Sequence, residues 1–511
     1  MRVAVALHGR DLPRVLRTYD LLSTHAYTHA TPTLYNAGTT SQYLASCFLY
    51  QPPVEGTLSV MTSCVTDLSK MWAVDGGVGL SLGAVPALEC VLFIITSISL
   101  ADLHSPSATS LPHSSGPVPL LDVLNVHARV HALNRWRRPS SVTAYLPVWH
   151  ADVHQFTMSF TKRSSIQSGL KHVFPALWVP DVLWVRALYH ATSTANVSPS
   201  IFPLPVCSAS VTVGGGASST LSMFRSCLKS TVLSSPPPMQ HMSLRVWPSA
   251  TTTSTCCGLQ SLTASARREV PSCCSRTTST VCDLVTAFPL LLIIARCILS
   301  PDRNNESHLG IIRLSNLCTE ITQFSAPSQP AVCTLASISL PVCVNGDGSF
   351  DFDRLQRLVN SVVISTDRCV DVSDYPTEDA AASALRSRAL GVGVQGLADT
   401  FMMLNLSFTS MGARELNISI FETIYYAALD ASCSLAEIHG PYPAWPGSPA
   451  SRGILQVDMW GVTPSNRHDF PALRARIARF GLRNSVITAL MPTASTSKLL
   501  GNFESFEPYT R

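Results

Sequence analysis

The sequence predicts an α/β protein whose strands form a largely parallel sheet or a barrel. From about residue 301 to residue 511, short apolar segments alternate with segments whose apolar residues recur at helical spacing, and this alternation is typical of α/β folds. A chain of 511 residues can also bury a large core. Its length allows two to four domains, or one large barrel with additions.

The elements of this C-terminal region follow from local patterns. Residues 350–372 have helical apolar spacing, and residues 388–404 pass from a glycine-rich apolar segment into a helix. Residues 415–443 predict an amphipathic helix that is ended by a Gly-Pro pair. Residues 485–500 predict a buried strand, a loop of small residues and the start of a helix.

Two segments differ from the rest of the chain. Residues 187–300 contain eight of the sixteen cysteines and long runs of Ser and Thr, with no persistent strand or helix period. Residues 89–114 have a similar composition. Natural linkers are hydrophilic and rich in Gly, Ser and Pro, whereas these segments mix Cys, Phe and Ile with Ser. We interpret both as aberrant sequence, translated in the wrong frame or joined from the wrong exon. A genuine lineage-specific insertion is the alternative.

Charge and hydropathy exclude several classes of protein. The formal net charge is only +4, and no block of Lys and Arg indicates nucleic-acid binding. The N-terminus does not resemble a secretory signal, and the apolar stretch 284–295 is too short to cross a bilayer. We therefore expect a cytoplasmic protein with no membrane partner. Its cysteines should be thiols, without a zinc site of paired CxxC motifs.

The run RLSNLCTE places a cysteine two positions before a glutamate. A core cysteine at the end of a strand, followed by an outward-facing glutamate, is the simplest explanation. If the run is extended, however, Asn316, Cys318 and Glu320 project from one face. An amide, a thiol and a carboxylate suit radical abstraction of hydrogen from a sugar, since a sulfur radical takes the hydrogen and the carboxylate accepts a hydroxyl proton. If the sugar is reduced in this way, the reaction also needs two electrons from a dithiol that can close to a disulfide. Cys47 and Cys333 are candidates for this dithiol.

Several motifs resemble the large, catalytic subunit of class I ribonucleoside-diphosphate reductases. NLCTEI and MPTAST are the most specific, and together the matching stretches cover roughly two-thirds of the chain. The stretches are THATPTLYNAGTTSQYLASCFL (28–49), GGVGLSL (76–82), GPVPLLDVLNVHARV (116–130), AYLPVWHADVHQF (144–156), HVFPALWVPDVL (172–183), LGIIRLSNLCTEI (309–321) and nearly all of 331–511.

The resemblance implies a role for each residue of the cysteine and glutamate motif. Cys318 resembles the cysteine that becomes the thiyl radical and removes the ribose 3′-hydrogen. Glu320 resembles the base on the 3′-hydroxyl, and Asn316 the amide that holds this hydroxyl. Cys47 and Cys333 resemble the pair that reduces the 2′ position and is left as a disulfide.

The resemblance also implies substrate contacts. The segment 492–496 is a loop of small and hydroxylated residues before a helix, where backbone N–H groups and hydroxyls can surround a diphosphate. On composition alone, such a loop is more often a helix N-cap. The adjacent Tyr425 and Tyr426 are interpreted as packing residues. The implied substrate-binding residues are Thr31, Ser46, Asn316, Glu320, Pro492, Thr493, Ala494, Ser495 and Thr496.

The implied fold is an incomplete ten-stranded α/β barrel. Residues 1–88, 115–186 and 301–511 would be barrel segments, the last with the active-site loop, separated by the aberrant segments 89–114 and 187–300. We expect the chain to be truncated relative to the family. The family's effector contacts are not recognisable in residues 51–57 and 133–141.

The family's chemistry implies partners and cofactors. No cofactor would bind in this subunit, because a metal-containing small subunit supplies the radical. Thioredoxin or glutaredoxin would be the reductant, ribonucleoside diphosphates the substrates, and ATP and deoxynucleoside triphosphates the effectors of a large-subunit homodimer. The alternatives are a catalytically inactive, reductase-like paralogue that binds a partner, and a glycyl-radical or cobalamin-dependent relative.

Overall fold

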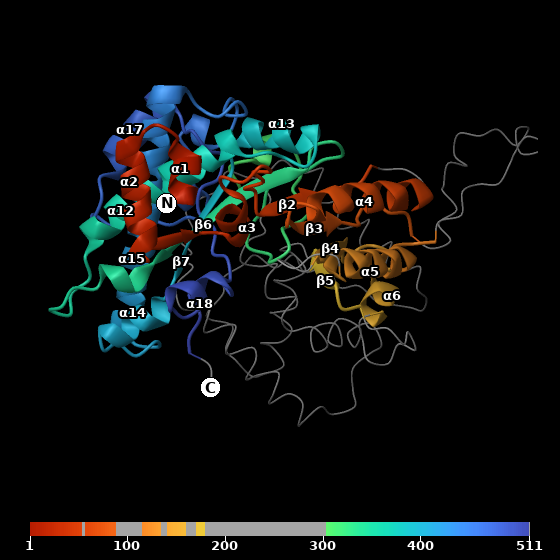
Figure 1. The fold of residues 1–511 in the computed structure, drawn as a ribbon, viewed down its shortest axis with the longest axis horizontal. Coiled ribbons are helices and arrows are strands. Elements are labelled where there is room, and N and C mark those ends of the chain that lie inside the picture. Colours follow the sequence, from red (N-terminus) through yellow and green to blue (C-terminus); the bar gives the residue numbers. More distant parts are fainter. Residues whose placement is uncertain (54–56, 88–114, 134–139, 160–169, 179–302, 510–511) are drawn as a thin grey trace, which may run out of the picture. The chain divides into compact units, whose positions relative to one another are not determined.

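The computed structural model describes residues 1–53, 57–87, 115–133, 140–159, 170–178 and 303–509 (Figure 1). Within these residues seven strands form one sheet, in the order β1-β6-β2-β3-β4-β5 with β7 paired to β6. The strands are β1 (Tyr27–His29), β2 (Cys47–Tyr50), β3 (Gly77–Ser81), β4 (Val142–Pro147), β5 (Val173–Trp178), β6 (Ala331–Ser339) and β7 (Leu390–Gln395).

The sheet contains two parallel sets of strands that meet in an antiparallel pair. Strands β2, β3, β4 and β5 are parallel neighbours, and so are β6 and β7. Between the two sets, β2 runs antiparallel to β6. Every residue of β2, β3, β4, β6 and β7 is buried. Strands covered on both faces are typical of parallel α/β sheets, and this explains their nearly continuous apolar sequences.

Thirteen α-helices lie in the described residues. They are α1 (Arg2–His8), α2 (Leu12–Ser23), α3 (Thr31–Asn36), α4 (Thr57–Trp72), α5 (Val118–Leu133), α6 (Val153–Met158), α12 (Phe352–Val372), α13 (Glu378–Ser387), α14 (Leu397–Met403), α15 (Met411–His439), α16 (Gln456–Met459), α17 (Phe470–Phe480) and α18 (Thr496–Leu500). Three short 3₁₀ helices accompany them: η5 (Ser307–Leu309), η6 (Leu340–Cys343) and η7 (Ala450–Arg452).

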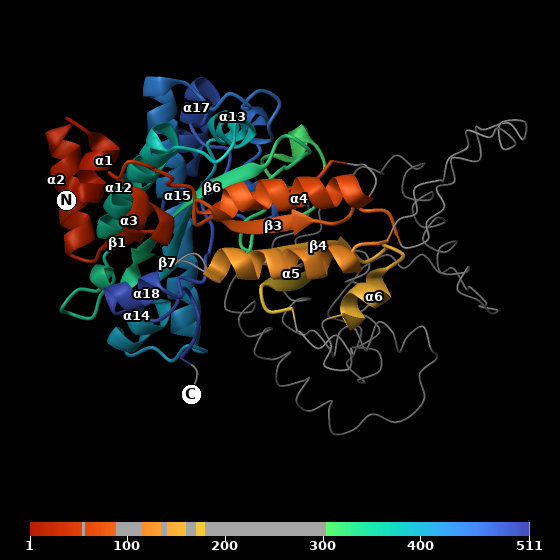
Figure 2. The same cartoon turned by 45° about the vertical axis from the view of Figure 1, so that its right-hand side comes forward.

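The longer of the helices, α12 and α15, lie beside the β6 and β7 part of the sheet. Helices α12 and α15 pack against each other, and α12 contacts both strands (Figure 2). The side chain of Asp351 caps α12 by accepting a hydrogen bond from the Arg354 N–H, and Ser410 caps α15 in the same way. Helix α15 ends at Gly440, whose φ of 77° suits a residue without a side chain. The apolar faces of these helices and strands form one buried core.

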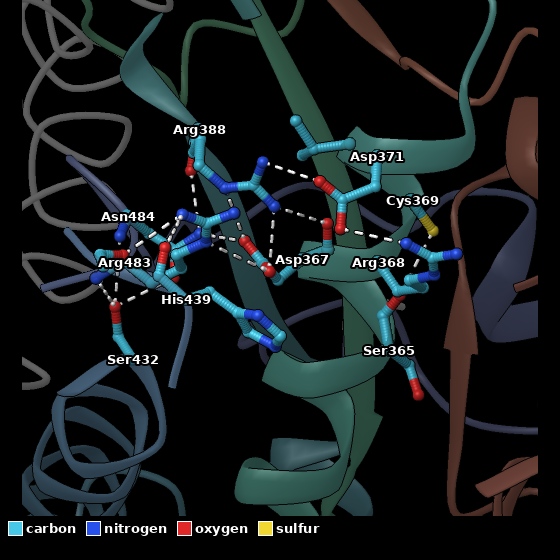
Figure 3. A network of polar contacts seen from close by, with 12 residues as sticks. Ser365, Asp367, Arg368, Cys369, Asp371, Arg388, Ser432, His439, Arg483 and Asn484 are labelled. Atoms are coloured by element: carbon cyan, nitrogen blue, oxygen red, sulfur yellow. Dashed lines mark hydrogen bonds and ion pairs between the residues drawn. The ribbon is translucent and has the colours of Figure 1, made fainter. Parts of the chain in front are cut away.

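A buried network of charged and polar groups joins α12 to the beginning of β7 (Figure 3). Arg388 donates to the Asp367 carboxylate at 2.9 and 3.1 Å and to Asp371 at 2.7 Å. Asn484 donates to Asp367 at 2.7 Å and to the Arg388 carbonyl at 3.0 Å, and it accepts a hydrogen bond from Ser432. Since Arg388 and Asp367 are both buried, the network fixes α12, α15 and the 484–489 segment relative to one another.

The α/β prediction is confirmed, and the predicted helices lie where their patterns placed them. The 486–489 segment follows β7, since Leu390 and Val392 donate to the carbonyls of Val486 and Ile487 and a parallel bridge pairs Val392 with Thr488. The adjacent tyrosines lie on α15. Tyr425 accepts a hydrogen bond from the Gln456 N–H, and the Tyr426 ring stacks on His468 at 4.6 Å.

The interpretations of 89–114 and 187–300 fall on residues outside the described part of the chain. In the described part, no helix has the length and apolar character needed to cross a membrane.

Candidate active site

The two predicted redox cysteines face each other where the parallel sets of strands meet. Cys47 is the first residue of β2, and the register pairs it with Cys333 of β6. The N–H of Ser46 donates to the Cys333 carbonyl at 3.1 Å, which holds the start of β2 on β6. Both cysteines are buried and neither is in a disulfide. The fold thus brings together two thiols that are distant in the sequence.

The Asn-Leu-Cys-Thr-Glu run lies on a loop that contacts three strands. A hydrogen bond from the Thr319 N–H to the Asn316 carbonyl closes a turn at 3.3 Å, and Thr319 has a φ of 69°. The expectation that this run is extended is therefore wrong. The carbonyls of Asn316 and Leu317 accept hydrogen bonds from side chains of β4 and not from the backbone of a neighbouring strand. The loop therefore does not need to be extended to satisfy these carbonyls.

Asn316 connects this loop to the cysteine pair. Its side chain is fully buried, and its Nδ2 donates to the sulfur of Cys47 at 3.2 Å. Its Oδ1 accepts a hydrogen bond from the Ile321 N–H at 3.1 Å, across the turn. The asparagine thus fixes both its own loop and the position of that loop relative to Cys47.

The other two motif residues are more accessible. Cys318 is exposed and Glu320 is half-buried. Burial raises the pKa of the Cys333 thiol well above its ordinary value, and the neighbouring charges of Cys47 and Glu320 raise this pKa further. The Cys333 thiol is therefore protonated at neutral pH.

Tyr145 of β4 lies within electrostatic range of the same groups. Burial raises its pKa well above the ordinary value, and Glu320, Cys318 and Cys47 add to the rise. The Tyr145 hydroxyl also donates to the carbonyl of Asn316, whose side chain bonds Cys47, so this tyrosine lies beside the residue that joins the loop to the cysteine pair.

The predicted substrate-binding residues lie in three places. Ser46 is buried beside Cys47, and Thr31 begins α3 just after β1. The loop 492–496 continues from the 486–489 segment beside β7 and leads into α18. In this loop Thr493 has a φ of 54° and its Oγ1 accepts a hydrogen bond from the Ser505 N–H at 2.8 Å. Pro492, Ala494 and Ser495 are exposed, whereas Thr493 and Thr496 are buried.

Sequence reasoning missed four residues that support the site: Gly79, Thr143, Tyr145 and Glu306. Thr143 and Tyr145 alternate along β4, and a pair of hydroxylated residues at strand spacing was a signal for a shared face. Glu306 is buried, with its carboxylate accepting hydrogen bonds from Ser485 at 2.7 Å and from the Phe324 N–H at 2.8 Å. No local pattern indicated that this carboxylate is buried.

Comparison with known proteins identifies the family. The model described as "Ribonucleotide reductase, barrel domain" matches residues 45–200 and 300–511, and that described as "Ribonucleotide reductase, all-alpha domain" matches residues 1–42. The chain is 37% identical to the ribonucleoside-diphosphate reductase large chain of Neurospora crassa and 36% identical to that of Schizosaccharomyces pombe. It is also 36% identical to the ribonucleoside-diphosphate reductase large subunit of Variola virus.

Each of these alignments covers 100% of this chain. The chain spans about half the length of the curated relatives it matches: 48% of the Neurospora protein, 55% of the Schizosaccharomyces protein and 58% of the viral protein. Since a family model covers more than half of the chain and the identities extend over all of it, the chain belongs to the ribonucleotide reductase large-subunit family.

Proposed function

We propose that this chain carries the active site for reduction of ribonucleoside diphosphates to 2′-deoxyribonucleoside diphosphates. One observation carries the proposal. Two buried thiols, Cys47 and Cys333, lie opposite each other on paired strands, and the amide of Asn316 from the cysteine loop donates to one of them. The amide bonds this dithiol, and its loop also carries the carboxylate of Glu320 and the thiol of Cys318. A dithiol, an amide, a carboxylate and a third thiol are the groups that suit a radical reduction of ribose.

In this proposal the exposed Cys318 carries the thiyl radical and takes the 3′-hydrogen atom from the ribose. Glu320 accepts the proton of the 3′-hydroxyl, and Asn316 orients that hydroxyl. The 2′-hydroxyl leaves as water with a proton from a thiol. Cys47 and Cys333 together supply two electrons and two protons and become a disulfide. The hydrogen atom then returns from Cys318 to the 3′ position, which restores the radical.

The remaining assignments follow the family. Thr31, Ser46 and the loop 492–496 would bind the substrate, with the backbone and hydroxyls of the loop near the diphosphate. The chain would bind no metal of its own, because a metal-containing small subunit would supply the radical. Thioredoxin or glutaredoxin would reduce the disulfide, and ATP or deoxynucleoside triphosphates would regulate a cytoplasmic homodimer.

Substitution of the motif cysteines tests the function. With the small subunit and a dithiol reductant, Cys318→Ser should abolish reduction, since an alcohol does not serve as a reversible hydrogen carrier. Cys333→Ser should prevent disulfide formation while leaving Cys318 able to exchange the 3′-hydrogen. The control is Cys343→Ser, which removes another buried thiol. Full activity of Cys318→Ser would contradict the proposed role of this residue.

A further inference from the structure

We propose that Thr143 and Tyr145 are positioning residues whose hydroxyls hold the turn that carries Cys318. We call them, together with Gly79 beneath the loop, the β4 clamp. The inference rests on the proposed function, because positioning matters only if Cys318 is the reacting thiol. The clamp itself is defined by contacts that do not depend on that function.

The clamp acts on two consecutive backbone carbonyls. Thr143 Oγ1 donates to the carbonyl of Leu317 at 2.7 Å, and the Tyr145 hydroxyl donates to the carbonyl of Asn316 at 2.7 Å. Alternate residues of a strand share a face, so one face of β4 presents both donors. The Asn316 carbonyl also accepts the hydrogen bond that closes the turn. Tyr145 therefore bonds the same oxygen that defines the geometry around Cys318.

The neighbouring strand lets the loop approach this closely. Gly79 of β3 lies beneath Ser315, and a Cβ at position 79 would come within 1.8 Å of the Ser315 carbonyl oxygen. The register aligns Gly79 with Thr143, so the position without a side chain lies beside the first hydroxyl donor. The loop therefore passes close to β3 at Ser315, and side chains of β4 bond its next two residues, Asn316 and Leu317.

Both donors are held rigidly by their surroundings. Thr143 and Tyr145 are buried, and the Tyr145 ring packs edge-on against Trp178 of β5 at 6.2 Å. The Leu82 N–H donates to the Tyr145 carbonyl at 2.8 Å, which secures β4 just beyond β3. Because each hydroxyl is already held in place by packing, it loses little side-chain freedom when it bonds the turn. Residues that do not touch the substrate can maintain the geometry of an active site in this way.

The loop is therefore held from two sides by different groups of Asn316. Asn316 binds Cys47 through its side chain while its carbonyl is bound by Tyr145, so the loop is held at once by β2 and by β4. Loss of either hydroxyl should loosen the turn without altering the groups proposed to contact substrate. The effect should then fall on kcat, with KM little changed.

Hydrogen exchange of the full chain tests the clamp without any assay of activity. Thr143→Val and Tyr145→Phe should each speed amide exchange in a peptide spanning 314–322 by roughly two- to tenfold, the range for loss of one hydrogen bond. Thr366→Val and Tyr425→Phe are matched controls. The buried Thr366 donates to the Val362 carbonyl at 2.7 Å, the half-buried Tyr425 accepts from the Gln456 N–H at 3.0 Å, and neither residue lies on this loop. The controls should leave the peptide unchanged.

Kinetics of the complete reductase give the second measurement. Both clamp variants should lower kcat by at least the exchange factor, with KM and global melting temperature close to those of the controls. Unchanged exchange in the 314–322 peptide, or an equal change in the controls, would overturn the clamp. If Tyr145→Phe does not fold, Thr143→Val decides the matter. If the unsubstituted enzyme reduces no nucleotide, the proposed function fails, and the exchange result still decides whether the clamp exists.

Discussion

Cys47 and Cys333 occupy paired positions on antiparallel strands, at the boundary between the two parallel sets of the sheet. Directly opposed residues in an antiparallel pair have Cα atoms roughly 4.5–5.5 Å apart. Disulfides span Cα separations of about 4.4–6.8 Å. The backbone therefore allows the two thiols to form a disulfide without rearrangement of the sheet, as the proposed redox role requires.

The first prediction concerns this pair. Mild oxidation should join Cys47 to Cys333 with the loss of two hydrogen atoms, and peptide mapping by mass spectrometry should identify the bridge. Because burial raises the pKa of Cys333, the rate should increase as the pH rises and more thiolate forms. The buried thiols of Cys343 and Cys369 are internal controls and should stay free. A bridge that preferentially uses another cysteine would contradict the pairing.

The second prediction concerns Gly79. Gly79→Ala should lower the free energy of unfolding by about 1–3 kcal/mol or more, because the new methyl group would overlap the Ser315 carbonyl. Gly346→Ala is the control, since a Cβ there would meet nothing within 4 Å. It should change stability by no more than about 0.5 kcal/mol. Urea denaturation measures both, and equal effects would show that the loop does not pack closely on β3.

The third prediction concerns the buried ion pair of Figure 3. Asp367→Asn should destabilise the protein by about 3–5 kcal/mol, because it leaves the buried guanidinium of Arg388 without its principal counter-charge. Asp458→Asn removes an equally bidentate but partly exposed pair with Arg474, and should cost no more than about 1 kcal/mol. A similar melting temperature for the two variants would exclude a dominant role for the buried network.

The fourth prediction concerns Glu306 and pH. Burial raises the pKa of its carboxyl above the ordinary value of 4.5, although its hydrogen-bond donors partly oppose the shift. A raised pKa in the folded state means that the stabilising contribution is present below the ordinary pKa and is lost as the pH rises through the folded value. Relative to Glu306→Gln, the wild type should therefore lose stability as the pH rises above the ordinary value of 4.5. Denaturant titrations at several pH values measure this, and parallel pH profiles for the two proteins would refute it.

The sequence by itself determined the fold class and the positions of the long helices, and it indicated the residues that are proposed to react. These features are local. Helical spacing in 350–372 and the Gly-Pro pair after α15 act within a few residues, so they could be recognised without knowing the fold. Asn316, Cys318 and Glu320 were likewise recognised from residue types that lie close together in the chain.

Only the tertiary structure decided how those groups are arranged. The register that pairs Cys47 with Cys333 depends on long-range contacts between strands, and a slip of one residue would turn the thiols to opposite faces. The turn at 316–319 accepts hydrogen bonds from Thr143 and Tyr145 at two of its carbonyls, and these partners are distant in the sequence. Local pattern alone therefore favoured an extended run. The bonds that bend the backbone exist only after β4 has taken its place in the sheet.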